Sequence, residues 1–422
     1  MSERREAAAA TAATPAPVIV SDDPASFPHG VLAERHPALV ARVLDTVPYG
    51  PAERAALTAL LDNHLKGVVE PPEPDAPGAE RWTEEWGLPA HLGRSWFAAP
   101  FLWAESYFYR RLLDALGYFG TGPWRGVDPF RPFKLAELDS PGTDEELAAL
   151  DALAGHPPAE RATALLHGSL WGNRADLGFR LSVESGHGTG TSGATGISGA
   201  TGASGTTGAS GATRDARLVA DDSEALWSLF PVSTLCLVAD NAGRELVPDL
   251  LLIDHLLRHG GAERAVLHVK PHPYYVSDAT TADVLDAVGR LHRAPGEAGD
   301  AGRRLWSALA GGRLALRAHP FSCAPLPYAD MPDDLRREFA AADLTLLKGD
   351  LNYRRLVGDR LWPPTTPFDR PTAYFPGPVA ALRTLKSDAI TGLDPHTETT
   401  LVEAEGQRWR TSGAHALIQV RP

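Results

Sequence analysis

Four short polar segments, each at or after the end of an apolar run with strand character, carry the residues that could do chemistry. In α/β enzymes the functional groups lie where strands end. Carboxylate and amide oxygens can bind a hard divalent cation, and lysine and arginine side chains can bind a phosphate group. The sequence therefore predicts a metal-dependent site for phosphoryl chemistry. The segments are Asp240-Asn241, Asp278, Lys348-Gly349-Asp350-Leu351-Asn352-Tyr353-Arg354 and Arg383-Thr384-Leu385-Lys386.

The first segment, Asp240-Asn241, follows the apolar run 235–239 and precedes a stretch with helical character at 245–259. The N–H groups at a helix start and the positive end of its dipole could bind a phosphate oxygen beside a cation. The alternative is that one of the two residues only caps the helix, which is a common use of both types. The Asp-Asn pair taken alone favours capping. The pair together with the other three segments favours a binding site.

The second segment, Asp278, follows a loop that Pro271 and Pro273 make rigid. A rigid loop would fix the carboxylate opposite the first acid with little entropy lost on binding. A helix cap is again the alternative. His268 and His272 have the spacing of zinc ligands on a helix, but the prolines forbid that helix. Oxygen ligation of magnesium, manganese or a similar ion is favoured instead.

The third and fourth segments combine positive charge with hydrogen-bonding groups. Gly349 lets the backbone turn closely around a ligand, and Lys348 would be costly at the end of a buried strand without an anionic partner. The alternative is a turn followed by a solvated basic helix end. Arg383 and Lys386 add charge, although both could point to solvent on an edge strand. The third segment could contact both hydroxyl and phosphate groups through Asp350, Asn352, Tyr353 and Arg354.

The elements that position these segments are also visible in the sequence. Helix spacing over 28–165 predicts a helical N-terminal domain, and 166–422 has the alternating character of an α/β domain. Apolar runs rich in Leu and Val indicate buried parallel strands, and the helical stretches between them indicate crossover βαβ units. The runs are 235–239, 265–269, 314–317, 344–347 and 380–385, and the helical stretches are 245–259, 281–293 and 333–342.

Two segments are expected to lie outside the packed core. Residues 1–27 are rich in Ala, Thr and Pro and lack a signal-peptide core, which predicts a disordered tail. Glycine recurs at every third position over 190–211 without any proline, so a flexible surface insertion at 185–213 is favoured over a collagen helix. The G-x-G-x-x-G pattern that begins at Gly188 is no dinucleotide site, because no helix can follow it.

Composition excludes several classes of protein. The net charge of -13 argues against a nucleic-acid partner, while a local basic pocket for one small phosphate remains possible. Cys236 and Cys323 form no C-x-x-C pair, so neither a disulfide framework nor a thiolate zinc site is indicated, and a cytoplasmic location is expected. No run approaches the roughly 20 apolar residues of a membrane helix, so no membrane association is expected.

The chain resembles the damage-control phosphatases, in the branch that includes the acidic-residue methyltransferase-like proteins. The resemblance implies an α/β fold, a three-layer α/β/α Rossmann-like domain with a helical N-terminal domain. It also implies a divalent-metal-dependent phosphatase that hydrolyses phosphorylated metabolites, sugar phosphates such as fructose 1-phosphate, in metabolite damage control. It rests on the four segments together with Glu105, Tyr109-Arg110-Arg111 and Leu170-Trp171-Gly172-Asn173-Arg174-Ala175-Asp176-Leu177.

By matching position, the resemblance also implies site residues. Asp240, Asn241 and Asp278 would be the ligands of a divalent metal such as Mn²⁺, Co²⁺, Ni²⁺ or Mg²⁺. The substrate would be a small-molecule phosphate ester. The residues expected to contact it are Asp240, Asn241, Asp350, Leu351, Asn352, Tyr353, Arg354, Arg383 and Lys386.

A mechanism follows from these assignments. The three metal ligands and Lys348 are expected to be catalytic, and a water on the metal is the expected nucleophile because coordination lowers its pKa. Lys348, Arg354 and Lys386 would neutralise the charge of the transferring phosphoryl group. An aspartyl-phosphate route through Asp240 is the competing idea. Ala242 argues against it, because it stands where such enzymes usually carry a second acid.

Two other functions stay open at this point. One is an S-adenosylmethionine-dependent protein carboxyl O-methyltransferase, in which Glu245 and Asp278 would contact the cofactor. The turn after Asp240 has a single glycine, whereas a nucleoside cofactor usually needs a Gly-rich approach, so the residues favour this function less. The other is a non-catalytic phospho-ligand-binding protein that keeps the same fold.

Overall fold

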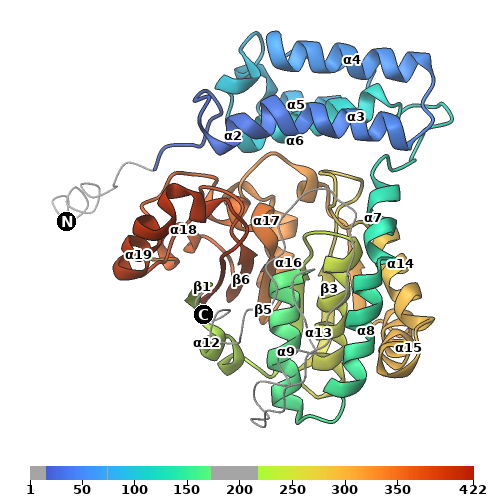
Figure 1. The fold of residues 1–422 in the computed structure, drawn as a ribbon, viewed down its shortest axis with the longest axis vertical. Helices are drawn as coiled ribbons and strands as arrows, with labels where there is room; N and C mark the ends of the chain where they lie inside the picture. Colours follow the sequence, from blue (N-terminus) through green and yellow to red (C-terminus); the bar gives the residue numbers. More distant parts are fainter. Residues whose placement is uncertain (1–15, 74, 173–216) are drawn as a thin grey trace, which may run out of the picture.

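A computed structural model describes residues 16–73, 75–172 and 217–422 (Figure 1). Its centre is a seven-stranded sheet in the order β1-β7-β6-β5-β2-β3-β4. Strands β2 to β6 run parallel, β7 is antiparallel to β6, and β1 is parallel to β7. The predicted α/β fold is confirmed. The strands are β1 Leu218–Asp221, β2 Val232–Val238, β3 Ala262–His268, β4 Leu314–Arg317, β5 Leu344–Lys348, β6 Val379–Thr384 and β7 Ala416–Arg421.

Helices cover both faces of the sheet, because successive strand residues point to opposite sides. Leu235 and Leu237 of β2 belong to one buried cluster with α8, α9, α13, α14 and α15. Cys236 and Val238 belong to the other, with α16, α17, α19 and the N-terminal helices. The helices are α8 Pro141–Leu153, α9 Pro158–Trp171, α12 Ser223–Ser228, α13 Leu246–Arg258, α14 Thr281–His292, α15 Gly296–Ala310, α16 Asp333–Ala340, α17 Gly349–Val357, α18 Asp369–Thr372 and α19 Pro395–Glu405.

The predicted parallel strands correspond to β2 through β6, and the four polar segments lie at or after the ends of β2, β3, β5 and β6. The edge strand β1 and its neighbour β7 were not predicted from the sequence. β7 reverses the direction of the sheet next to β6, so the sheet is mixed and not wholly parallel. The carboxyl ends of β2, β3, β5 and β6 still meet at one edge, and this edge carries the candidate site.

A separate helical layer lies above that edge in Figure 1. Its longest buried element is α6, and its core is aromatic, with Trp82, Trp96, Tyr107 and Phe108 all buried. This layer and one face of the sheet share a single hydrophobic cluster. The helices are α2 Phe27–Gly30, α3 His36–Thr46, α4 Pro51–Lys66, α5 Ala79–Glu84 and α6 Phe101–Ala115.

The predicted boundary of the helical domain at residue 165 is not where the layers divide. Helices α7 (Arg131–Leu138), α8 and α9 pack on α13, α14 and α15 as part of the α/β body. Helix spacing shows that a segment has an apolar face, and it does not show which partner that face covers. The helical N-terminal layer therefore ends before α7.

The predicted disordered tail 1–27 also needs correction for its second half. The Ile19 N–H donates to the Asp359 carbonyl at 3.1 Å, and the Ile19 carbonyl accepts from Phe101 N–H at 2.8 Å. Ile19 is buried, so this short stretch binds both layers through its backbone. The predicted insertion at 185–213 lies outside the described residues. Within the described ranges, no helix is long and apolar enough to cross a membrane.

Candidate functional site

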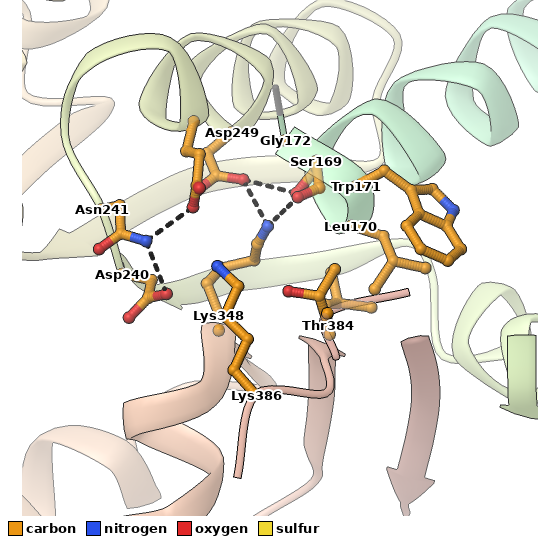
Figure 2. A pocket seen from close by; sticks show the side chains of 14 residues that line it. Ser169, Leu170, Trp171, Gly172, Asp240, Asn241, Asp249, Lys348, Thr384 and Lys386 are labelled. Atoms are coloured by element: carbon orange, nitrogen blue, oxygen red, sulfur yellow. Dashed lines mark hydrogen bonds and ion pairs between the residues drawn. The ribbon is translucent and has the colours of Figure 1, made fainter. Parts of the chain in front are cut away.

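A polar cavity of about 180 Å³ opens at the carboxyl ends of β2, β5 and β6 (Figure 2). One wall comes from the end of α9, and another from the start of α13. Its charged and amide side chains are Asp240, Asn241, Glu245, Asp249, Lys348 and Lys386, and its other lining residues include Ser169, Trp171, Gly172, Gly349, Thr384 and Gly413.

Asp240 follows the end of β2 and touches the start of α17. Its backbone carbonyl accepts from the Ala279 N–H at 2.9 Å, which joins it to the loop after β3. Gly349 has a φ of +81°, and a Cβ at this position would lie 1.8 Å from Asp240 Oδ2. Only glycine combines that backbone conformation with such a close approach to the carboxylate.

The Asn241 amide lies between two carboxylates. Its Nδ2 donates to Glu245 Oε2 at 2.8 Å and to Asp240 Oδ2 at 3.3 Å, while its Oδ1 accepts from Ser277 Oγ at 2.7 Å. Turning the amide over would direct Oδ1 to the Asp240 side and leave Nδ2 beside a hydroxyl that can accept as well as donate. Asn241 can therefore serve as an oxygen ligand without losing its contact to Ser277.

Asp278 is held beside this pair by its backbone. It forms an isolated antiparallel bridge with Asn241, and its Oδ2 accepts from Tyr275 N–H at 3.0 Å. Buried Lys134 donates to the Asp278 carbonyl at 2.9 Å and to Asp283 Oδ2 at 3.0 Å. The backbone bridge thus places Asp278 next to Asn241 and Asp240, but the Asp278 side chain is buried and does not line the cavity.

The electrostatics of Asp240 fit a cation site. Burial raises its pKa well above the ordinary value, the carboxylates of Asp278 and Glu245 raise it further, and Lys386 and Lys270 oppose them. A divalent cation at these oxygens would reverse the effect and favour the ionised acid. Among the described residues, no three His, Cys, Asp and Glu side chains are arranged to hold a metal. Such an ion would therefore need the Asn241 oxygen or waters as well, as hard cations commonly accept.

Lys348 makes a buried ion pair inside the protein. Its Nζ lies 2.9 Å from Asp249 Oδ1 and also donates to the Ser169 carbonyl. The Ser169 hydroxyl donates to the same Asp249 oxygen at 2.5 Å. Burial raises the pKa of Asp249, and the Lys348 ammonium opposes that shift. The anionic partner that the sequence required for Lys348 is thus Asp249, and the pair lines the cavity.

Lys386 differs from Lys348. Its side chain is exposed and lines the cavity, and its ammonium has no ion pair with an acid among the described residues. It lowers the pKa of Asp240, which places its charge near that carboxylate. Lys386 is therefore the lysine whose charge is available to an anion in the cavity.

Arg383 and Asp350 bind each other, away from the cavity. Arg383 is fully buried, and its guanidinium lies 2.7 Å from Asp350 Oδ1, 2.9 Å from Ser387 Oγ and 4.3 Å from the centre of the Tyr353 ring. Burial disfavours the charged form of Asp350, but Arg383 and Arg354 hold its pKa below the ordinary value. The structure does not bring Asp350 or Arg383 to the cavity.

Asn352 and Tyr353 are also bonded within the fold. Asn352 accepts from Tyr328 OH at 2.9 Å and donates to the Ala239 carbonyl at 3.1 Å, which ties α17 to the end of β2. Tyr353 is fully buried, and its hydroxyl donates to Gln419 Oε1 at 2.9 Å. Neither side chain lines the cavity.

Leu351 and Arg354 face the helical layer. Arg354 lies 2.7 Å from Asp359 and 3.0 Å from Glu105 of α6, and both pairs are buried. Leu351 packs with Leu102 of the same helix. These contacts join α17 to the helical layer, and Leu351, Asn352, Tyr353 and Arg354 do not line the cavity.

Comparison with known proteins identifies the family of the chain. The family described as the Damage-control phosphatase ARMT1-like domain matches residues 31–401. The chain belongs to this family. It is 29% identical to Damage-control phosphatase ARMT1 of Mus musculus over 449 residues, covering 94% of this chain and 96% of the mouse protein. It is 28% identical to the protein of that name in Homo sapiens, with the same coverage. A crystal structure of a DUF89 family protein from Pyrococcus horikoshii aligns with a TM-score of 0.44 and 14% identity, over 85% of this chain and 91% of that one.

Membership of the damage-control phosphatase family confirms the resemblance inferred from the four polar segments. The structure adds residues that the segments did not include. Ser169 and Trp171 reach the cavity from the end of α9, and Asp249 reaches it from α13. Asp249 carried a usable signal, because an acid four residues after Glu245 shares a face with it on an otherwise apolar helix. For Ser169 the sequence carried no such signal.

Proposed function

We propose that this protein is a divalent-metal-dependent phosphatase that hydrolyses small phosphorylated metabolites, with sugar phosphates such as fructose 1-phosphate among them. The charge of the cavity is the observation that carries the proposal. Among the described residues, three acids and two lysines line it: Asp240, Glu245 and Asp249, with Lys348 and Lys386. A phosphate dianion would be repelled by this set unless a cation were added, and membership of the damage-control phosphatase family supports the same chemistry.

Asp240, Asn241 and Asp278 would hold the cation. When bound, it supplies charge to stabilise the phosphoryl group and lowers the pKa of a coordinated water. The first turn of α17 begins at Gly349 beside Asp240, so the positive end of this helix dipole lies on the same side. Lys386 adds a mobile positive charge that can follow the phosphoryl oxygens as they separate from the leaving group.

No observation favours methyl transfer. Glu245 lines the cavity, but its carboxylate already accepts from Asn241 Nδ2 at 2.8 Å. Among the described residues, the cavity measures about 180 Å³, below the roughly 300 Å³ at which pockets for larger ligands begin. A small polar phosphate ester fits it better than a nucleoside cofactor does.

The experiment is phosphate release from a panel of sugar phosphates with manganese, cobalt, nickel or magnesium, against a chelator. Asp240→Asn keeps the size of the side chain and removes its charge. It should reduce metal-dependent release more than about 100-fold, because Asp240 would hold the cation that stabilises the phosphoryl group. Asp343→Asn is the matched control. It makes the same change from Asp to Asn at an exposed residue just before β5, at the other end of the sheet. Absence of release with every metal would refute the proposal.

A further inference from the structure

We infer that the Lys348–Asp249 pair forms hydrogen bonds with hydroxyl groups of the substrate. This would give the enzyme a preference for polyol phosphates over phosphate esters without hydroxyls. The inference rests on the proposed function and assigns a specificity role within the same cavity. Figure 2 shows the pair between the end of α9 and the Asp240 side of the cavity.

Each partner has a hydrogen-bonding position left over. An ammonium has three N–H donors, and Lys348 uses two of them on Asp249 Oδ1 and the Ser169 carbonyl. Asp249 Oδ1 accepts from Lys348 and from the Ser169 hydroxyl. Its Oδ2 has no hydrogen bond to any described residue. One N–H donor of Lys348 and one acceptor oxygen of Asp249 are therefore left. Because both side chains are buried, the directions of these two groups are fixed.

A hydroxyl group matches this arrangement better than a phosphate does. It can accept from the remaining N–H of Lys348 and donate to the free oxygen of Asp249 at the same time. A phosphate oxygen would be attracted by the ammonium and repelled by the carboxylate beside it. A site built to bond a hydroxyl also rejects ligands without one, since its buried polar groups would then lose water without gaining a partner.

The other lysine of the cavity supplies the contrast. Lys386 is exposed, acts electrostatically on Asp240 and lacks an acidic partner among the described residues. The cavity therefore has a phosphate end near Asp240 and Lys386 and a neutral, hydroxyl-binding end at Asp249 and Lys348. A substrate that spans both ends would place its phosphate group at the first end and a hydroxyl group at the second.

Two esters with the same carbon chain test this assignment: glycerol 3-phosphate, which has two hydroxyls, and n-propyl phosphate, which has none. We expect wild type to prefer glycerol 3-phosphate in kcat/KM, mainly through KM, because hydroxyl contacts contribute uniform binding. Asp249→Asn should lower that preference about 10- to 100-fold. Lys386→Met should lower kcat/KM for both esters by similar factors and leave the preference intact.

Ser169→Ala is the milder variant, since it removes only the hydroxyl that orients Asp249 and should lower the preference in the same direction by a smaller factor. It keeps the test decisive if Asp249→Asn unfolds, which thermal denaturation would reveal. A wild type without preference for glycerol 3-phosphate would overturn the inference. Equal losses for both esters in the folded Asp249 or Ser169 variants would overturn it as well.

Equilibrium binding separates this inference from the proposed function. Calorimetry with manganese present compares glycerol 3-phosphate with inorganic phosphate, and needs no turnover. If no ester is hydrolysed, the proposed function fails, and the inference is still judged by whether Asp249→Asn removes tighter binding of the polyol ester. Equal affinity of wild type for the two ligands, or no affinity for either, would refute the inference.

Discussion

Gly349→Ala is the substitution whose consequence can be worked out most directly from the structure. At a φ of +81°, a residue with a Cβ costs about 1–2 kcal/mol in free energy of unfolding. The new Cβ would also lie 1.8 Å from Asp240 Oδ2, where ordinary contacts begin at 3.4 Å. The carboxylate must then move by about 1.6 Å, and a misplacement of about 1 Å near reacting groups can cost 100-fold in rate.

Gly358→Ala is the matched control. Gly358 ends the same helix, α17, with a φ of +91°, and the nearest atom to a Cβ there is 3.7 Å away. The two variants therefore carry the same backbone strain, while only Gly349→Ala displaces Asp240. Asp240 can move away from the new methyl group, so thermal denaturation should show similar losses of stability for the two variants.

The assay is metal-dependent phosphate release, together with calorimetric titration of manganese into each variant. We expect release by Gly349→Ala to be about 100-fold or more below that of Gly358→Ala, with weaker manganese binding. If both variants release phosphate and bind manganese equally well, the close approach of Gly349 to Asp240 has no functional meaning, and the reasoning is refuted.

Two further predictions concern residues outside the cavity. Arg354→Gln leaves Glu105 and Asp359 buried without their cation, so it should cost about 3–5 kcal/mol in free energy of unfolding; a raised KM at unchanged denaturation midpoint would instead support the substrate contact predicted from sequence. Burial lowers the pKa of His64 to about 4 and that of His36 well below its ordinary value, so both are neutral in the fold. The contribution of His64 to stability is full above the unfolded pKa of about 6.5 and is lost as pH falls toward 4, by about 3 kcal/mol, and that of His36 is lost in the same direction. Denaturant titrations between pH 7 and 4 should show this slope, and the double variant His36→Leu/His64→Leu should flatten it.

The sequence predicted the strand ends well, because a short apolar run followed by polar residues has few other meanings in an α/β chain. It thereby located Asp240, Asn241, Asp278 and Lys386 at one edge of the sheet. Strands β1 and β7 were missed. Both lie at or next to the far edge of the sheet, beyond β6, and β1 is only four residues long.

The roles of the buried cations could not be predicted in the same way. A sequence shows that a lysine or arginine in an apolar segment needs an anionic partner, since an unpaired buried charge is costly. It does not show whether that partner is a ligand or another residue. For Lys348 the partner is Asp249, 99 positions earlier in the chain, and for Arg354 one partner is Glu105 in another layer. Only the fold brings these residues together.

The residues that turned out not to line the cavity still bear on the site through α17. This helix starts at Gly349 against Asp240 and is bonded to Glu105 of the helical layer through Arg354. Asn352, between them, bonds to the Ala239 carbonyl next to Asp240. Because a helix is stiff along its axis, a shift of the helical layer would move the start of α17 and with it the contact to Asp240. The helical layer therefore helps to set the position of the metal-ligand edge, although it contributes no side chain to the cavity among the described residues.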